Sequence, residues 1–139
     1  MPKSVDFEID HAKRRVIRTV RGDADSDEIG AELLRIIDEH PMSVGYDTVT
    51  DWRGYQGKIE WRDLAEFAKA FTVRYARYLE QPDADRRPIR AAFVIEDKMA
   101  ATLVSAMQQL YRNRTLHVFP DIESALAWLD ADAAATGGP

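Results

Sequence analysis

Aromatic and basic side chains are concentrated in one short segment of the chain, residues 52–61. Together they offer apolar surface and positive charge, which suit an apolar ligand, an anion or a partner protein. The candidate residues are Trp52, Arg53, Tyr55, Lys58 and Trp61. Residues 46–52 are predicted to form a strand, and ligands of open α/β sheets bind beyond the carboxyl ends of strands. The segment is therefore the candidate loop for a ligand or a partner.

The spacing of apolar residues predicts different roles for these aromatic rings. Trp61 starts a series of apolar positions that recur every three or four residues, which is typical of the buried face of a helix. We therefore expect Trp61 in the core, and Trp52 or Tyr55 at the exposed edge of a pocket. In the alternative interpretation all three rings belong to the core, as aromatic residues commonly do.

The same segment contains a glycine-rich turn, Gly54-Tyr55-Gln56-Gly57-Lys58. A nucleotide-hydrolase phosphate loop has four residues between its glycines and a Ser or Thr after the lysine. Here two residues separate the glycines and Ile59 follows the lysine, so nucleotide hydrolysis is excluded. The glycines are expected to form a turn, and a weak contact of Lys58 and Arg53 with an anion is the alternative.

No group of residues predicts a metal, a cofactor or a catalytic triad. Asp23, Asp25 and Asp27 match the first ligand positions of a calcium loop, but the glycine and the final glutamate of that loop are absent. The three histidines have no acidic neighbours at ligand spacing. We expect a non-enzymatic protein without a cofactor. An acid–base enzyme that uses Asp51 with His117 is the remaining catalytic alternative.

Composition describes one ordinary acidic domain. The chain has 139 residues, a formal net charge of −5 and no cysteine. Absence of cysteine excludes disulfides and thiol nucleophiles, and the acidic balance argues against nucleic-acid binding. No apolar run is long enough to span a membrane, and the first residues lack the apolar core of a signal peptide. We expect a cytoplasmic protein without a membrane span.

Hydrophobic periodicity predicts strands that alternate with helices. Residues 5–9 alternate apolar and acidic side chains, which indicates an edge strand with residues 15–21 as its hairpin partner. Further strands are predicted at 46–52, 89–95 and 116–119, and helices at 25–40 (with Asp25 and Glu28 as a capping box), 61–80, 99–110 and 121–129. The predicted fold is α/β: a mixed five-stranded sheet, mostly parallel with an antiparallel edge strand, covered by about four helices. One domain covers residues 1–130, and 131–139 form a flexible tail.

This element order, the segment Asp51-Trp52-Arg53-Gly54-Tyr55 and the ending VFPDIESALAWL at 118–129 resemble the SpoIIAA-like group of STAS domains. These small bacterial proteins are related to anti-sigma-factor antagonists and, more remotely, to CRAL-TRIO lipid-transfer domains. The resemblance implies a regulatory, protein-binding role and a phosphorylatable Ser or Thr at the start of the helix after the middle strand. Residues 57–61, which occupy that position, contain no hydroxyl side chain. We carry over no phosphoacceptor, and Thr48 or Thr50 is the alternative place for a phosphate.

Two functions remain open. The first is a regulatory or protein-interaction domain without the phosphorylation switch, which binds a partner protein or a second copy of itself. The exposed face of the long helix with Arg74, Arg77 and Tyr78 is a candidate for such docking. The second is a carrier or binding protein for a small hydrophobic, lipid-like ligand, which uses the aromatic segment.

Overall fold

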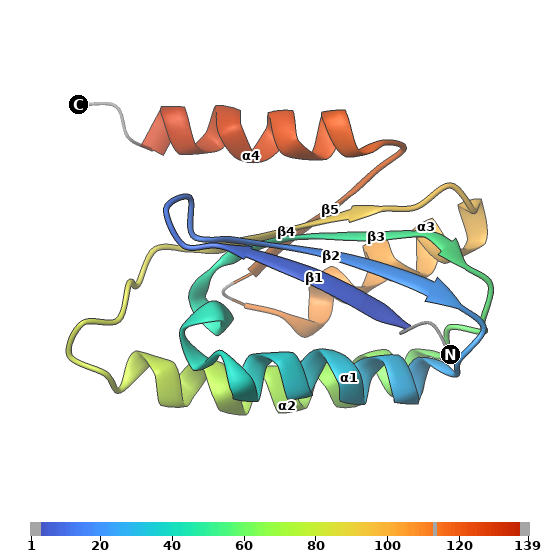
Figure 1. The fold of residues 1–139 in the computed structure, drawn as a ribbon, viewed down its shortest axis with the longest axis horizontal. Coiled ribbons are helices and arrows are strands. Elements are labelled where there is room, and N and C mark those ends of the chain that lie inside the picture. Colours follow the sequence, from blue (N-terminus) through green and yellow to red (C-terminus); the bar gives the residue numbers. More distant parts are fainter. Residues whose placement is uncertain (1–3, 113, 137–139) are drawn as a thin grey trace.

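One sheet lies between two layers of helices in the computed structural model (Figure 1). The structure describes residues 4–112 and 114–136, except for the side chains of 132–136. The strands are β1 (Val5–Asp10), β2 (Arg15–Gly22), β3 (Asp47–Tyr55), β4 (Ile89–Val94) and β5 (Arg114–Phe119). The helices are α1 (Ser26–Glu39), α2 (Trp61–Leu79), α3 (Lys98–Ala106) and α4 (Ile122–Thr136), with short 3₁₀ turns η1 (Pro41–Gly45) and η2 (Met107–Leu110).

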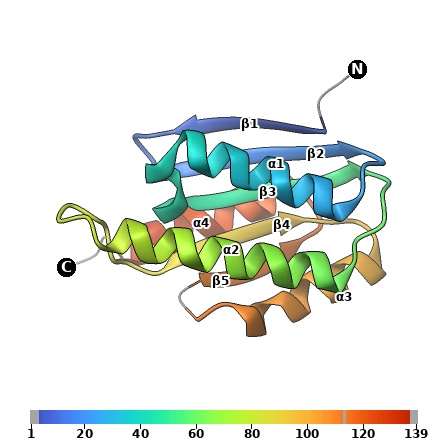
Figure 2. The same cartoon turned by 90° about the horizontal axis from the view of Figure 1, so that it is seen from below.

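The strands lie side by side in chain order, β1-β2-β3-β4-β5. Strand β1 is antiparallel to β2, with Val5 opposite Val20, and the other neighbours are parallel. Each parallel pair is joined by a helix that crosses the same face of the sheet, as Figure 2 shows for α1, α2 and α3. The predicted mixed sheet with an antiparallel edge strand is therefore confirmed, as is the long helix from Trp61.

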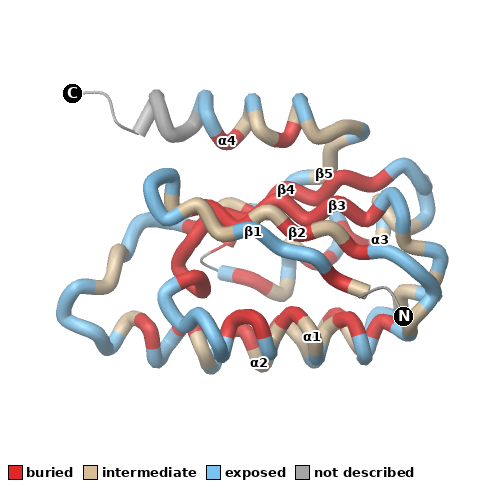
Figure 3. The backbone as a smooth tube through the Cα atoms, viewed as in Figure 1, coloured by how far each residue is buried: buried red, intermediate tan, exposed pale blue. Residues whose placement is uncertain are grey.

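Alternate positions of strands β2 to β5 face two different cores. The larger core lies between the sheet and helices α1, α2 and α3, and includes Val20, Ile29, Phe71 and Phe93. The smaller core lies under α4, where Val49 and Val94 pack against Leu129. Because helices cover both faces, the central strands are buried along most of their length (Figure 3).

Three local expectations need correction. Strand β3 continues to Tyr55 instead of ending at Trp52, because its last residues still pair with the end of β2. Asp25 occupies the N-cap position of α1, but its side chain makes no capping hydrogen bond, so the capping box does not form. Helix α4 continues to Thr136, so residues 131–136 of the predicted tail are helical. Residues 137–139 lie outside the described residues.

Candidate functional site

A groove of about 650 Å³ lies where β3 and β4 end and α3 begins. This is the carboxyl edge of the two strands, where ligands of open α/β sheets bind. Four of the five candidate residues from the sequence contribute to it, and the fifth, Trp61, does not. The lining residues are Trp52, Arg53, Tyr55, Gly57, Lys58, Ile59, Ile95, Glu96, Asp97, Met99, Ala100 and Leu103.

Trp52 and Tyr55 form the inner wall of this groove. Their rings meet edge to face with centroids 5.1 Å apart. The Tyr55 hydroxyl donates a hydrogen bond of 2.6 Å to the backbone oxygen of Ala24, which ties β3 to the start of α1. Burial, together with the nearby carboxylates of Asp25 and Asp63, raises the pKa of Tyr55 to about 12. This wall is therefore held in place and is uncharged at neutral pH.

The expected burial of Trp61 was wrong, whereas of the two rings proposed for the exposed edge, Trp52 or Tyr55, Tyr55 is the more exposed. Trp52 is only 8% exposed and belongs to the larger core, although it was a candidate for the exposed edge of the pocket. Trp61 is 36% exposed and lies outside that core cluster, although its spacing predicted a buried ring. It is the first residue of α2, where the helix has only begun to cover the sheet. Tyr55, which is half-buried, is the more exposed of the two rings in the groove wall.

The two cations of the groove, Arg53 and Lys58, already have acidic partners two residues away in the sequence. Arg53 binds Asp51 through Nε and Nη2, at 3.0 and 2.9 Å, and Lys58 lies 3.6 Å from Glu60. Burial would raise the pKa of Asp51, but its hydrogen bonds from Arg53 outweigh this effect and lower it. These pairs leave little net positive charge for an anionic ligand.

Gly57 explains why the turn after β3 needs glycine. A Cβ atom at this position would lie 2.4 Å from both the Ala24 backbone oxygen and the Tyr55 hydroxyl. Only glycine, which has no side chain, can occupy this position without disrupting the hydrogen bond between these two groups. Gly54 has no such constraint, since a Cβ there meets its nearest neighbour at 3.5 Å. The expected role of the glycines in forming a turn thus explains why residue 57 is a glycine.

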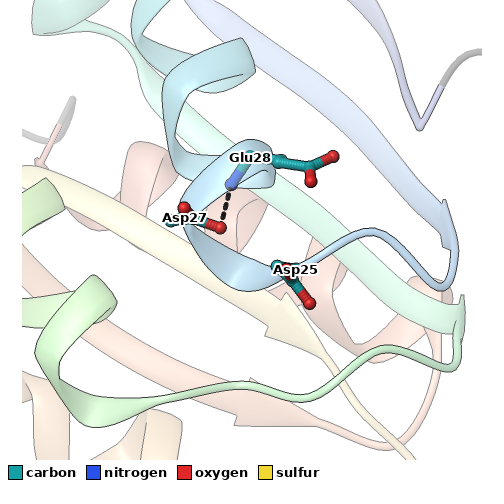
Figure 4. Close-up of side chains that lie close together, drawn as sticks. All are labelled: Asp25, Asp27 and Glu28. Carbon is teal, nitrogen blue, oxygen red and sulfur yellow. Dashed lines mark hydrogen bonds between the residues drawn. The ribbon is translucent and has the colours of Figure 1, made fainter.

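Other candidate chemistry is dispersed or exposed. Asp25, Asp27 and Glu28 bring carboxylate oxygens within 4.8 Å of one another, but all three are exposed, and Asp27 accepts a hydrogen bond from the Glu28 backbone N–H (Figure 4). This is an acidic first turn favoured by the helix dipole. Asp51 is engaged by Arg53, and His117 contacts the rings of Phe119 and Trp128. The structure gives no contact between Asp51 and His117 among the described residues.

A second depression, of about 480 Å³, lies at the far end of α1 and α2. Arg74, Arg77 and Tyr78, the residues predicted as a docking face, line it together with Met42. Tyr78 is buried, however, and Arg74 forms a two-point ion pair with Asp38. The face is therefore more neutral and more enclosed than its sequence suggests.

Sequence reasoning missed two buried arginines, Arg18 on β2 and Arg114 on β5. Both lie on the side of the sheet covered by α1 and α2, and each is only 4% exposed. Arg18 donates to Thr50 and Arg114 to Thr48, each at 3.2 Å. The available signal was alternation, because Arg18 lies between the inward positions Val16 and Val20.

Comparison with known proteins identifies the fold and nothing finer. The chain is similar to the crystal structure of an uncharacterised protein of the DUF3478 family with a SpoIIAA-like fold, from Shewanella loihica PV-4. The TM-score is 0.54 and the sequence identity 12%, over 91% of this chain and 93% of the other. No family model matches the chain. No curated protein matches it significantly. The chain thus has a SpoIIAA-like fold, as its resemblance implied, and no helix of the described residues is long and apolar enough to cross a membrane.

Proposed function

We propose that this chain is a non-enzymatic binding protein whose groove at the ends of β3 and β4 holds a small molecule with an apolar body. The observation that carries the proposal is the groove itself. Its volume of about 650 Å³ is in the range of roughly 300–1,000 Å³ that small-molecule sites occupy. It also lies at the carboxyl edge of the sheet, where such sites occur.

The chemistry of the lining favours an apolar body over a strongly charged one. Ile59, Ile95, Ala100 and Leu103 contribute aliphatic side chains, and the rings of Trp52 and Tyr55 form the inner wall. Met99 is 83% exposed at the groove. A flexible methionine can fold over an apolar ligand and remove both surfaces from water. Arg53 and Lys58, each paired with an acidic residue, can orient a polar end of the ligand without dominating the affinity.

Docking of a protein partner, in a regulatory role, is the second candidate. The exposure of Met99 also favours it, since methionine is common at surfaces that bind several partners. In that case the groove receives a side chain of the partner. The two functions differ in whether the purified protein takes up a small apolar molecule on its own.

The test combines mass spectrometry of molecules extracted from the purified protein with titration of a fluorescent fatty-acid analogue. Met99→Ser removes the exposed apolar side chain of the groove. Met42→Ser is the matched control, because Met42 is also an exposed methionine but lines the depression at the far end of α1 and α2. We expect Met99→Ser to weaken binding of the analogue about tenfold, which corresponds to about 1.4 kcal/mol of lost apolar contact, and Met42→Ser to leave it unchanged.

Absence of saturable binding by the wild type, with no copurifying molecule, would contradict the small-molecule function and favour the partner. An equal loss in both variants, or a loss only in Met42→Ser, would place the ligand elsewhere and also contradict the proposal.

A further inference from the structure

Arg18 and Arg114 meet in the larger core, above the middle of the sheet. Arg114 starts on β5 and donates from Nη2 to the Thr48 hydroxyl on β3, so its side chain crosses β4. Ala91, which pairs with Thr48 in the neighbouring strand, is small enough to leave that path open. Arg18 reaches Thr50 on the same strand from the opposite side. Two guanidinium groups therefore approach one another over β3, beneath α1 and α2.

This pair has no acidic partner on its own face of the sheet. Within the described residues, no carboxylate forms an ion pair with either arginine. Asp47 attracts Arg114 at longer range, but the Asp47 carboxylate forms an ion pair of 2.6 Å with Arg90. Arg90 also donates a hydrogen bond to the backbone of α4. Burial and the charge of Arg114 lower the pKa of Arg18 to about 9, which still leaves it cationic at neutral pH. Buried charges without counter-charges are costly, so an anion bound next to this pair would stabilise it.

Aromatic rings take the place of that anion around Arg114. Its guanidinium carbon lies 4.5 Å from the centre of the Phe71 ring and 5.1 Å from that of Tyr111. Arg114 Nε is buried without a hydrogen-bond partner. Burial raises the pKa of the Tyr111 hydroxyl, and the charge of Arg114 and a hydrogen bond with it partly offset this rise. Arg114 Nε is therefore a donor that an incoming acceptor can satisfy.

Arg114 also lines a pocket of about 200 Å³ that begins at the surface. Thr72 and Arg112 at its edge are exposed, while the rest of its wall is aromatic and aliphatic. The other lining residues are Phe71, Tyr75, Ile89, Leu110 and Tyr111. None of its lining residues is acidic, which distinguishes this pocket from the groove at the ends of β3 and β4. On the inner side, Arg18, Arg114 and Trp52 border a further cavity of about 30 Å³, with Asp63 also in its lining.

We propose that Arg114, supported by Arg18, binds the carboxylate of a small aromatic or branched aliphatic acid whose apolar part fills the pocket between α2 and Tyr111. A planar carboxylate matches the guanidinium fork and supplies a counter-charge for the two arginines. The aromatic and aliphatic wall matches an apolar body about the size of a benzene ring. This site is separate from the groove and does not depend on the function proposed for it.

The experiment is calorimetric titration of the intact chain with phenylacetate. Two further probes separate the contributions of charge and apolar body: 2-phenylethanol, which keeps the ring without the charge, and acetate, which keeps the charge without the ring. We expect saturable binding of phenylacetate, and binding at least tenfold weaker for both other probes. Inorganic phosphate tests whether any anion suffices, and we expect it to bind at least tenfold more weakly too.

Variants locate the site. Arg114→Met should abolish phenylacetate binding, whereas Arg62→Met, an exposed arginine of α2 outside every pocket named above, removes the same charge and should leave it unchanged. If Arg114→Met does not fold, Leu110→Trp fills the pocket without replacing either arginine and should weaken binding at least tenfold. Circular dichroism verifies that each variant is folded.

Four results would overturn the proposal. One is equal binding of phenylacetate and 2-phenylethanol, which would mean that no cation contacts the ligand. Another is binding of phosphate or acetate as tight as that of phenylacetate, since the apolar wall would then contribute nothing. The third is phenylacetate binding that survives both Arg114→Met and Leu110→Trp. A loss of phenylacetate binding in Met99→Ser would instead place that ligand in the groove, which also contradicts the assignment to Arg114.

Discussion

Replacing Trp52 by alanine should destabilise the protein far more than replacing Trp61 by alanine. Trp52 is 8% exposed and packs in the larger core against Tyr55, whereas Trp61 is 36% exposed and lies outside that core. The two residues have the same side chain, so the comparison isolates the effect of burial. It also tests the main point at which the structure departs from the sequence-based expectation.

The magnitude follows from the buried area. A buried tryptophan removes about 150–250 Å² from water, which at about 25 cal/mol per Å² contributes about 4–6 kcal/mol. Truncation also removes the indole N–H of Trp52, which is buried without a hydrogen-bond partner and opposes folding. We therefore expect a loss of about 3–5 kcal/mol for Trp52→Ala, as for other large aromatic truncations. For Trp61→Ala we expect about 1 kcal/mol, as for a partly exposed residue outside the core.

Urea unfolding followed by circular dichroism measures both losses without relying on tryptophan fluorescence. Trp52→Phe is the control, because it keeps an aromatic ring while it removes the unpaired N–H and the second ring of the indole. It should cost less than about 2 kcal/mol. A smaller loss for Trp52→Ala than for Trp61→Ala would refute the burial argument. A loss for Trp52→Phe as large as for Trp52→Ala would contradict the reasoning, because the aromatic ring that the phenylalanine keeps would then contribute nothing to stability.

Two further predictions concern the contacts behind the groove wall. Gly57→Ala should destabilise the protein by about 1–3 kcal/mol in urea unfolding, because its Cβ would collide with the hydrogen bond between Tyr55 and Ala24, whereas Gly54→Ala should cost less. The raised pKa of Tyr55, about 12, means that the folded state keeps this proton after the unfolded chain begins to lose it near pH 10. Stability should therefore fall between pH 10 and 12, and fall less steeply in Tyr55→Phe; equal slopes for the two proteins would contradict this assignment.

Most of the fold could be predicted because its strands and helices follow from the regular spacing of apolar residues in the sequence. Alternation in residues 5–9 indicated an edge strand with one solvent-exposed face, and in the structure this strand pairs antiparallel to β2. The apolar positions from Leu64 to Tyr75 marked the buried face of α2. The position of the groove could also be predicted, since the carboxyl edge of the sheet follows from strand direction alone.

Whether an individual side chain is buried, and in which core, could not be predicted in the same way. Both faces of β3 are covered by helices, so alternation does not reveal which core Trp52 enters. Trp61 has the right spacing for the core, but it occupies the first position of its helix, where spacing cannot show whether other elements cover it. Arg18 occupies an inward position between two valines, yet its charge argues for an outward one. Burial at these positions is decided by tertiary packing.

Thr48 and Thr50 connect the missing phosphorylation switch to the buried arginines. They are the hydroxyl residues closest in sequence to the switch position, but both are buried and accept hydrogen bonds from Arg114 and Arg18. A kinase would have to unfold the middle strand to reach them. Phosphate, moreover, is an anion of the kind that these arginines lack, so the two cations offer a place where negative charge can enter by binding instead of by covalent modification. If this fold responds to a signal here, a small acid in the Arg114 pocket is a more accessible trigger than phosphorylation of β3, because it enters through a surface opening and leaves the sheet intact.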